Sequence, residues 1–152
     1  MEIVAFLDDS HHAHIIGFIS CSQFSHAKPI HFIVDSGSST TTLLGDDVTR
    51  LGINCAGLQP APVPCLTASG TTVTPYVLPD VDLLFTLRQR WFERRPDVTT
   101  FHFASLHCNP PPTQPVFIPE EGYLQTCSLL GMDFLSIFKT WAFKRRELIL
   151  RT

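Results

Sequence analysis

The sequence places an acidic residue directly after a strongly apolar run in Phe32-Ile33-Val34-Asp35-Ser36-Gly37-Ser38-Ser39-Thr40. Residues 30–34 predict a strand that is buried on both faces. A carboxylate at the end of such a strand is unusual, because burying a lone charge costs several kcal/mol. Gly37 allows a sharp turn that brings backbone N–H groups toward the Asp35 carboxylate, and the neighbouring serine hydroxyls can hold the loop. We therefore expect a functional loop at the edge of a core.

The sequence around this segment favours short strands over helices. Twelve prolines and eight glycines break the chain into short apolar segments. Strands are expected at 3–7, 14–20, 30–34, 81–87, 98–106, 141–143 and 148–150, with turns at 8–12, 67–72 and 144–147. Short helices are expected at 46–52, where Gly52 would end the helix, and at 132–138. The predicted fold class is all-β, mostly β with two short helices.

Length and charge limit the function classes. The 152 residues predict one domain spanning 1–152, with a substantial buried core. A net charge of -3 argues against nucleic acid as a partner, since nucleic-acid-binding domains are usually basic. No apolar run reaches the roughly 18 residues that cross a bilayer, so no membrane partner is expected. An acidic Glu2 stands where a signal peptide needs a basic residue, so a cytoplasmic location is predicted.

The cysteines and histidines do not form a recognisable metal motif. Five cysteines, at positions 21, 55, 65, 108 and 127, lack the spacing of a zinc knuckle, and buried thiols are expected. His12 and His14 would share one face of a strand, which suits two metal ligands. They flank a polar turn without an adjacent third ligand, so we favour solvated histidines. The same interpretation applies to His102, His107 and Cys108, and His31 is expected to be a hydrogen-bonded strand residue. No metal site is predicted.

Residues 88–119 are expected to form an insertion or a long loop. Four arginines surround Trp91 and Phe92, an arrangement that can stack on single-stranded nucleic acid. The overall negative charge favours a solvated turn or a site for acidic peptides. Five prolines between 110 and 119 give the end of the segment polyproline character, which an SH3-type module would recognise, although a plain loop is favoured.

Three elements, in order, resemble the retropepsin-like, single-domain branch of the aspartic proteases. Asp35-Ser36-Gly37 after a hydrophobic strand is similar to the Asp-Ser/Thr-Gly signature of that family, and 47–53 fits the sequence that follows it. Residues 129–135 resemble the hydrophobic pair, glycine and helix near the family's C-terminus. Residues 67–70 fall where the family has its flap hairpin. Together these elements cover most of the chain.

The resemblance implies a closed β-barrel that carries half of an active site and pairs with a second copy in a two-fold homodimer. The chemistry needs two carboxylates that share one proton, and this chain has one motif. The implied activity is an aspartic endopeptidase that cleaves peptide or protein substrates without a metal or an organic cofactor. The terminal segment 148–150 is a candidate strand for the dimer sheet.

The resemblance also implies a role for each matching residue. Asp35 would be the catalytic carboxylate, Ser36 would hydrogen-bond across the dimer, Gly37 would place its backbone beside the substrate, and Ser38 would hydrogen-bond the outer carboxylate oxygen. Ala68, Ser69 and Gly70 would lie at the flap tip, while Leu130 and Gly131 would pack beneath the active loop.

Two alternatives remain open at this point. A catalytically silent dimeric module of the same fold would bind peptides or protein partners, and replacement of Asp35 would then cost no function. A metal-binding β domain would use His12, His14 and a cysteine, and would contain stoichiometric metal.

Overall fold

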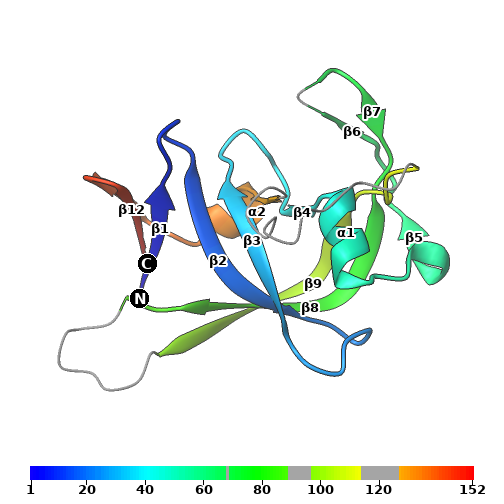
Figure 1. The fold of residues 1–152 in the computed structure, drawn as a ribbon, viewed down its shortest axis with the longest axis horizontal. Helices are drawn as coiled ribbons and strands as arrows, with labels where there is room; N and C mark the ends of the chain where they lie inside the picture. Colours follow the sequence, from blue (N-terminus) through cyan, green and yellow to red (C-terminus); the bar gives the residue numbers. More distant parts are fainter. Residues whose placement is uncertain (68, 89–96, 114–126) are drawn as a thin grey trace.

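The computed structural model describes residues 1–67, 69–88, 97–113 and 127–152 (Figure 1). The strands are β1 (Glu2–Leu7), β2 (Ala13–Ser20), β3 (Lys28–Val34), β4 (Thr42–Leu43), β5 (Gln59–Pro60), β6 (Cys65–Leu66), β7 (Thr72–Val73), β8 (Tyr76–Thr86), β9 (Val98–Cys108), β10 (Ser128–Leu130), β11 (Thr140–Lys144) and β12 (Glu147–Arg151). The helices are α1 (Gly45–Leu51), the 3-10 turn η1 (Cys55–Gly57) and α2 (Met132–Leu135). No helix among the described residues has the length and apolar character needed to cross a bilayer.

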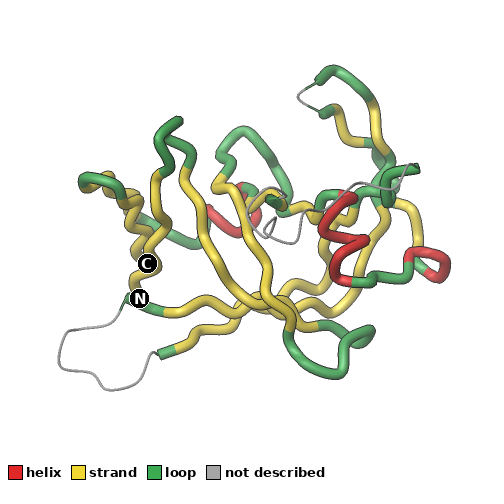
Figure 2. The backbone as a smooth tube through the Cα atoms, viewed as in Figure 1, coloured by secondary structure: helices red, strands yellow, loops and turns green. Residues whose placement is uncertain are grey.

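Six of the strands close into a barrel, which confirms the predicted all-β fold class. The sheet runs through β2, β3, β10, β4, β9 and β8, and β8 pairs again with β2 (Figure 2). The buried side chains of Phe32, Phe85 and Phe134 fill the barrel, with ring centroids of Phe85 and Phe134 5.3 Å apart. Buried and exposed residues alternate along β2 and β8, as expected for strands with one face inward. The inward-facing residues complete the core.

The parallel pairing of β3 with β10 positions the acidic loop. Phe32, Ile33 and Val34 lie opposite Ser128, Leu129 and Leu130, so both strands end at the same edge of the barrel. The N–H of Asp35 continues this ladder by donating to the Leu130 carbonyl at 3.1 Å. Asp35 therefore leaves the sheet directly beside Gly131.

The local predictions largely agree with the structure. β1 and β2 form the expected hairpin, and α1 ends at Gly52, whose φ of 71° is left-handed. The second helix is shorter than the predicted 132–138, because the N–H groups of Ile137 and Phe138 donate to carbonyls three residues back and not four, so the helix gives way to a turn after Leu135. β8 begins earlier than predicted, at Tyr76, and accommodates Pro79 opposite Ser105.

Two expectations about long segments need correction. The predicted insertion over 88–119 contains the barrel strand β9, which pairs with β8 along its whole length; residues 89–96 and 114–119 of it lie outside the described part. Residues 148–150 were expected to offer an edge for a dimer sheet, but β12 is paired with β1 on one side and with β11 on the other. The edge strand at this end of the sheet is β11.

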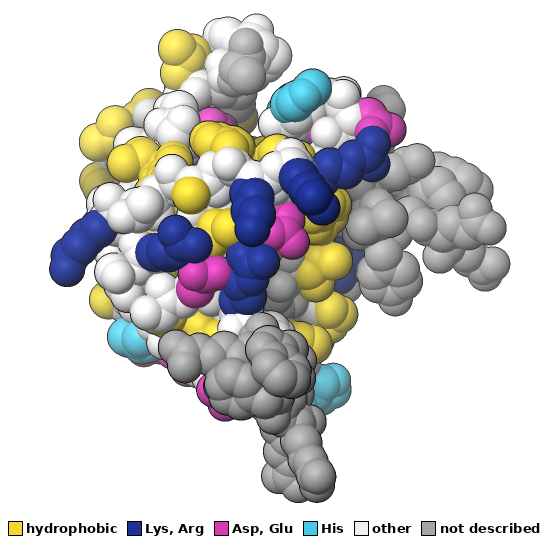
Figure 3. All heavy atoms as spheres, turned by 90° about the vertical axis from the view of Figure 1, so that its left-hand side faces the viewer, with side chains coloured by type: hydrophobic (Ala, Val, Ile, Leu, Met, Phe, Trp, Pro, Cys, Tyr) yellow, Lys and Arg dark blue, Asp and Glu magenta, His cyan; other side chains and the backbone are white. Residues whose placement is uncertain are grey.

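Charged side chains gather on the side of the molecule where β1 and β12 lie, with acids among the Lys and Arg residues (Figure 3). Arg88 contacts Glu2 at 3.2 Å and Glu147 at 3.5 Å, and Arg151 contacts Glu2 at 2.7 Å. These pairs are solvent-exposed, so each adds little to stability. They neutralise one another and leave no unopposed basic patch at these positions.

The barrel closes where β2 crosses β8 at Gly17, and replacing this glycine is expected to weaken the fold. A Cβ atom at position 17 would lie 2.7 Å from both the Leu84 carbonyl oxygen and the Phe85 ring. Gly17→Ala should therefore lower the free energy of unfolding by about 1–3 kcal/mol, measured by urea denaturation. Gly57→Ala is the matched control, because a Cβ at position 57 meets nothing within 4 Å. Equal stability of both variants would contradict the close crossing.

Candidate active site

Asp35 is presented by a tight loop between β3 and β4. The N–H of Gly37 donates to Asp35 Oδ1 at 2.9 Å, and the N–H of Ser38 donates to the Asp35 carbonyl at 3.2 Å. The Asp35 side chain is half-buried, whereas Ser36 and Gly37 are exposed. The loop thus holds the carboxylate in one orientation and offers its outer surface to another molecule.

Within one chain, the Ser38 side chain does not make the expected hydrogen bond to the Asp35 carboxylate. Its Oγ donates to the Thr40 carbonyl at 2.7 Å and not to the Asp35 carboxylate. The hydrogen bond to that carboxylate comes instead from the backbone of Gly37. The Ser38 hydroxyl is used to fold the second half of the loop, because a short hydroxyl side chain readily bonds a nearby backbone carbonyl.

Leu130 and Gly131 lie directly against the loop. Leu130 is fully buried, and a Cβ atom at Gly131 would overlap the Thr40 carbonyl group. Two further hydrogen bonds cross the contact: Met132 N–H to the Ser38 carbonyl at 2.9 Å, and Asp133 N–H to the Ser39 carbonyl at 3.2 Å. A residue without a side chain is needed at 131 for the two backbones to approach this closely.

Asp133 and Thr41 form a clamp that sequence analysis missed. Asp133 Oδ1 accepts from Thr41 N at 2.8 Å, from Thr41 Oγ1 at 2.6 Å and from Phe134 N at 2.8 Å. Thr41 Oγ1 in turn accepts from the buried Gly131 N–H at 3.1 Å. Hydrogen bonds to an ionised carboxylate are among the stronger ones, so the clamp fixes the loop end onto α2.

A buried ion pair ties α1 to the same region. The side chain of Asp47 is fully buried; its Oδ1 accepts from Arg50 Nη2 at 2.7 Å and its Oδ2 from Ser128 Oγ at 2.6 Å. Ser128 Oγ also accepts from Leu44 N at 3.2 Å. A buried carboxylate persists only when such partners satisfy it. The network connects the start of β10 to the helix that follows β4.

The predicted flap is a separate hairpin formed by β6 and β7. Thr67 N donates to the Thr71 carbonyl at 2.9 Å, and Gly70 has a φ of 80°, which suits a tight tip. Ser69 and Gly70 are exposed, while Ala68 lies outside the described residues. Figure 1 shows the hairpin projecting away from the barrel. Its tip makes hydroxyl-to-hydroxyl contacts among Thr67, Ser69 and Thr71.

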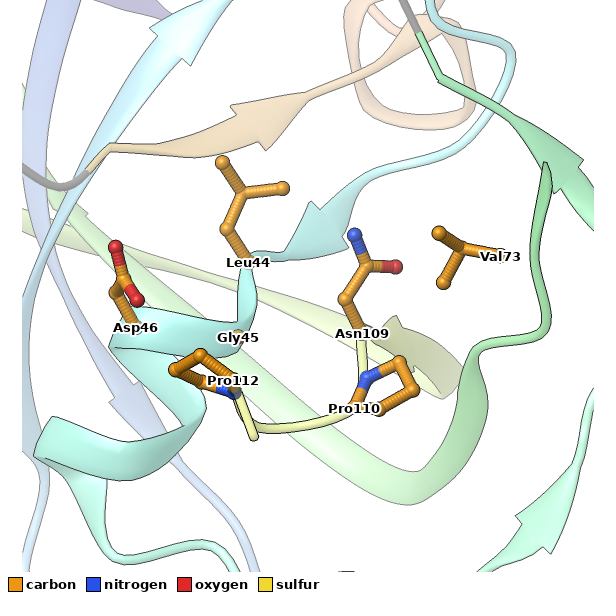
Figure 4. A pocket seen from close by; sticks show the side chains of 7 residues that line it. All are labelled: Leu44, Gly45, Asp46, Val73, Asn109, Pro110 and Pro112. Atoms are coloured by element: carbon orange, nitrogen blue, oxygen red, sulfur yellow. The ribbon is translucent and has the colours of Figure 1, made fainter. Parts of the chain in front are cut away.

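A recess of about 310 Å³ lies between the base of this hairpin and α1 (Figure 4). It is lined by Leu44, Gly45, Asp46, Val73, Asn109, Pro110 and Pro112. The Pro110 carbonyl approaches Gly45 so closely that a Cβ there would overlap it. Asp35 is not part of the lining, so this recess is distinct from the surface that carries the carboxylate.

The histidines are arranged differently from the predicted solvated group. His11 and His12 are exposed, but His14 is buried, with Nε2 3.0 Å from Asp8 Oδ2 and Nδ1 3.0 Å from His31 Nε2. His14 lies on the face of β2 opposite the core residues Ile15 and Ile19, and it is buried because Phe6 stacks on it there. The other candidate group, His102, His107 and Cys108, does not come together in one site. His102 is exposed and pairs with Asp82, whereas Cys108 is buried.

Comparison with known proteins supports the fold. No protein-family model and no curated protein matches the chain. Among solved structures it is similar to the crystal structure of a retropepsin-like aspartic protease from Rickettsia conorii, with a TM-score of 0.55 and 22% identity, covering 99% of this chain and 90% of that chain. The chain therefore has a retropepsin-like fold, which confirms the family resemblance at the level of architecture.

Removal of the Thr41 hydroxyl is expected to loosen the loop. Thr41→Val keeps the side-chain shape but removes a donor to Asp133 and leaves the buried Gly131 N–H without its acceptor. The free energy of unfolding should fall by about 1–3 kcal/mol in urea denaturation. Thr86→Val is the matched control, since Thr86 is exposed at the end of β8. A variant at 41 as stable as the control would show that the clamp contributes nothing.

Proposed function

We propose that this chain is an aspartic endopeptidase that acts as a homodimer through its 1–152 domain. The observation that carries the proposal is the placement of Asp35: an Asp-Ser-Gly loop leaves a retropepsin-like barrel and is held from below by Gly131. The loop exposes Ser36 and Gly37 outward, which is the surface that a second copy would meet.

The proposed reaction uses Asp35 from each of two copies. Two like-charged carboxylates at close range cannot both be ionised, so the pair shares one proton. The ionised carboxylate acts as a base toward a water molecule, and the protonated one donates a hydrogen bond to the scissile carbonyl. The water oxygen attacks the carbonyl carbon, and the amine leaves with a proton. No metal or organic cofactor takes part in this chemistry.

The remaining predicted residues would serve binding and alignment. Ser36 would hydrogen-bond across the two-fold axis, and Gly37 would place its backbone beside the substrate. Ser38 would shape the loop through Thr40, as it does within one chain. The hairpin tip at 68–70 would close over an extended peptide that is hydrogen-bonded like an added strand. We place the enzyme in the cytoplasm and its substrates among peptides and proteins.

Asp35→Asn should abolish peptide cleavage. The amide keeps the size of the carboxylate but cannot take up a proton from water, so the cleavage rate on a diverse peptide mixture should fall by at least about 100-fold. Wild-type activity should be greatest at acid to mildly acid pH and decline toward alkaline pH, because the pair needs one shared proton. The measurement is fragment formation by mass spectrometry at a series of pH values.

Asp9→Asn is the matched control for this substitution. The Asp9 side chain is 92% exposed and its contact to Arg146 is 3.3 Å, so its replacement should leave cleavage unchanged. Cleavage that persists in Asp35→Asn would exclude the proposed mechanism. A folded, dimeric wild type that cleaves nothing would favour the catalytically silent peptide-binding module instead.

A mixing experiment tests whether two chains share one site. When equal amounts of wild type and Asp35→Asn exchange freely, roughly half of all dimers are mixed, so activity per wild-type chain should drop to roughly half. Asp9→Asn mixed in the same way should have no effect. Activity that stays constant at every mixing ratio, under conditions where exchange is demonstrated, would show that one chain is sufficient.

A further inference from the structure

Two histidines and a cysteine converge on the outer side of the barrel wall, on the face of β2 and β3 opposite the core residues Ile15 and Phe32. His14 comes from β2, His31 from β3, and Cys127 immediately precedes β10. All three are at least nine-tenths buried. His14 Nδ1 is 3.0 Å from His31 Nε2. Cys127 Sγ lies 4.0 Å from His14 Nδ1, and it lies 3.3 Å from Nδ1 and 3.9 Å from Nε2 of His31. Two consecutive strands and a segment about a hundred residues later thus contribute one imidazole or thiol group each.

The tautomer of His14 is set by Asp8. Asp8 Oδ2 lies 3.0 Å from His14 Nε2, and Asp8 Oδ1 accepts from the N–H groups of Ser10 and His12. A carboxylate oxygen accepts hydrogen bonds, so in this contact the donor is His14 Nε2. His14 Nε2 therefore carries a proton, and Nδ1 directs its lone pair toward the other two side chains.

The distances among the three atoms match a tetrahedral metal centre. A zinc ion with N and S ligands at its usual bond lengths separates two nitrogens by about 3.3 Å and a nitrogen from a sulfur by about 3.6 Å. His14 Nδ1 and His31 Nε2 are 3.0 Å apart, and the sulfur lies 3.3 to 4.0 Å from the three ring nitrogens named above, so one ligand atom of each residue is within reach of a shared ion. A carboxylate that accepts the second N–H of a ligating histidine is the usual support for such a ligand.

We propose that His14 Nδ1, one ring nitrogen of His31 and Cys127 Sγ bind one zinc-type divalent cation, with water in the fourth position and Asp8 orienting His14. Binding requires the Cys127 thiol to release its proton to solvent and the hydrogen bond between the two imidazole rings to break. The proton of His31 then stays on the ring nitrogen that does not bind the metal. Imidazole and thiolate ligands favour zinc over magnesium or calcium, which take oxygen ligands. This proposal departs from the expectation that no metal is bound, and it does not depend on the proposed proteolysis.

A bound metal would cross-link three segments of the barrel wall. It joins β2 to β3 and to the start of β10, and β3 leads from His31 to Asp35 four residues later. A ligand that binds only the folded state stabilises it in proportion to its affinity. Phe6 covers the site from outside, stacked on His14 and His31 at centroid distances of 5.2 and 6.0 Å.

The first test is metal titration of the full chain after treatment with a chelator. Wild type should bind one Zn²⁺ per chain with a rise in melting temperature, and Co²⁺ should produce a thiolate-to-cobalt charge-transfer band. Cys127→Ser should lose that band and bind Zn²⁺ at least about 10-fold more weakly. Cys65→Ser, at a partly exposed cysteine in the hairpin, should behave like wild type. Circular dichroism establishes that each variant is folded.

The second test separates the buried site from an exposed alternative. Asp8, His12 and His14 also bring ligand atoms within 4.8 Å of one another, but His12 is exposed. His12→Gln should leave zinc affinity unchanged, while Asp8→Asn should weaken it about 10–100-fold. The proposal is overturned if folded wild type binds no stoichiometric metal, or if His12→Gln abolishes binding that Cys127→Ser retains. Asp35→Asn should bind zinc like wild type, so the result is independent of catalysis.

Discussion

The parallel pairing of β3 with β10 is the constraint on which the candidate active site depends. Parallel neighbours cannot be joined by a tight turn, and in this chain nearly a hundred residues separate Val34 from its partner Leu130. Because both strands run in the same direction, their ends emerge together, and Asp35 and Gly131 meet at one edge of the barrel. The carboxylate is thus positioned by two backbones and not by the loop alone.

Buried polar groups are concentrated around this edge. Asp133 and Asp47 each lie in the first turn of a short helix, and each accepts hydrogen bonds from a distant segment. Asp47 is fully buried, so losing one of its partners would leave a charge in a low-dielectric interior. Asp133 is exposed, and its hydrogen bonds to Thr41 hold the end of the loop that carries Asp35.

Local features were predictable from sequence, whereas long-range contacts were not. The strand before Asp35, the glycine that ends α1 and the hairpin of β6 and β7 follow from residue types within a few positions. The Thr41–Asp133 clamp joins residues 92 positions apart, and the contact of His31 with Cys127 joins residues 96 apart. Neither pair has a local pattern, since its members become neighbours only after β10 inserts between β3 and β4. The pairing of β12 with β11 is a local hairpin, whereas its pairing with β1 joins the two ends of the chain and has no local pattern.

The edge strand β11 has a consequence for the solubility of the molecule. Within the described residues it is paired only with β12, and Phe143 on it is 70% exposed. The unpaired backbone N–H and C=O groups of an edge strand can pair with a strand of another copy, and repeated pairing of this kind forms a fibril. Lys144, Arg145 and Arg146 end this strand and its turn, and concentrated positive charge opposes such stacking. Neutralising these three residues would remove a barrier against aggregation without touching the barrel.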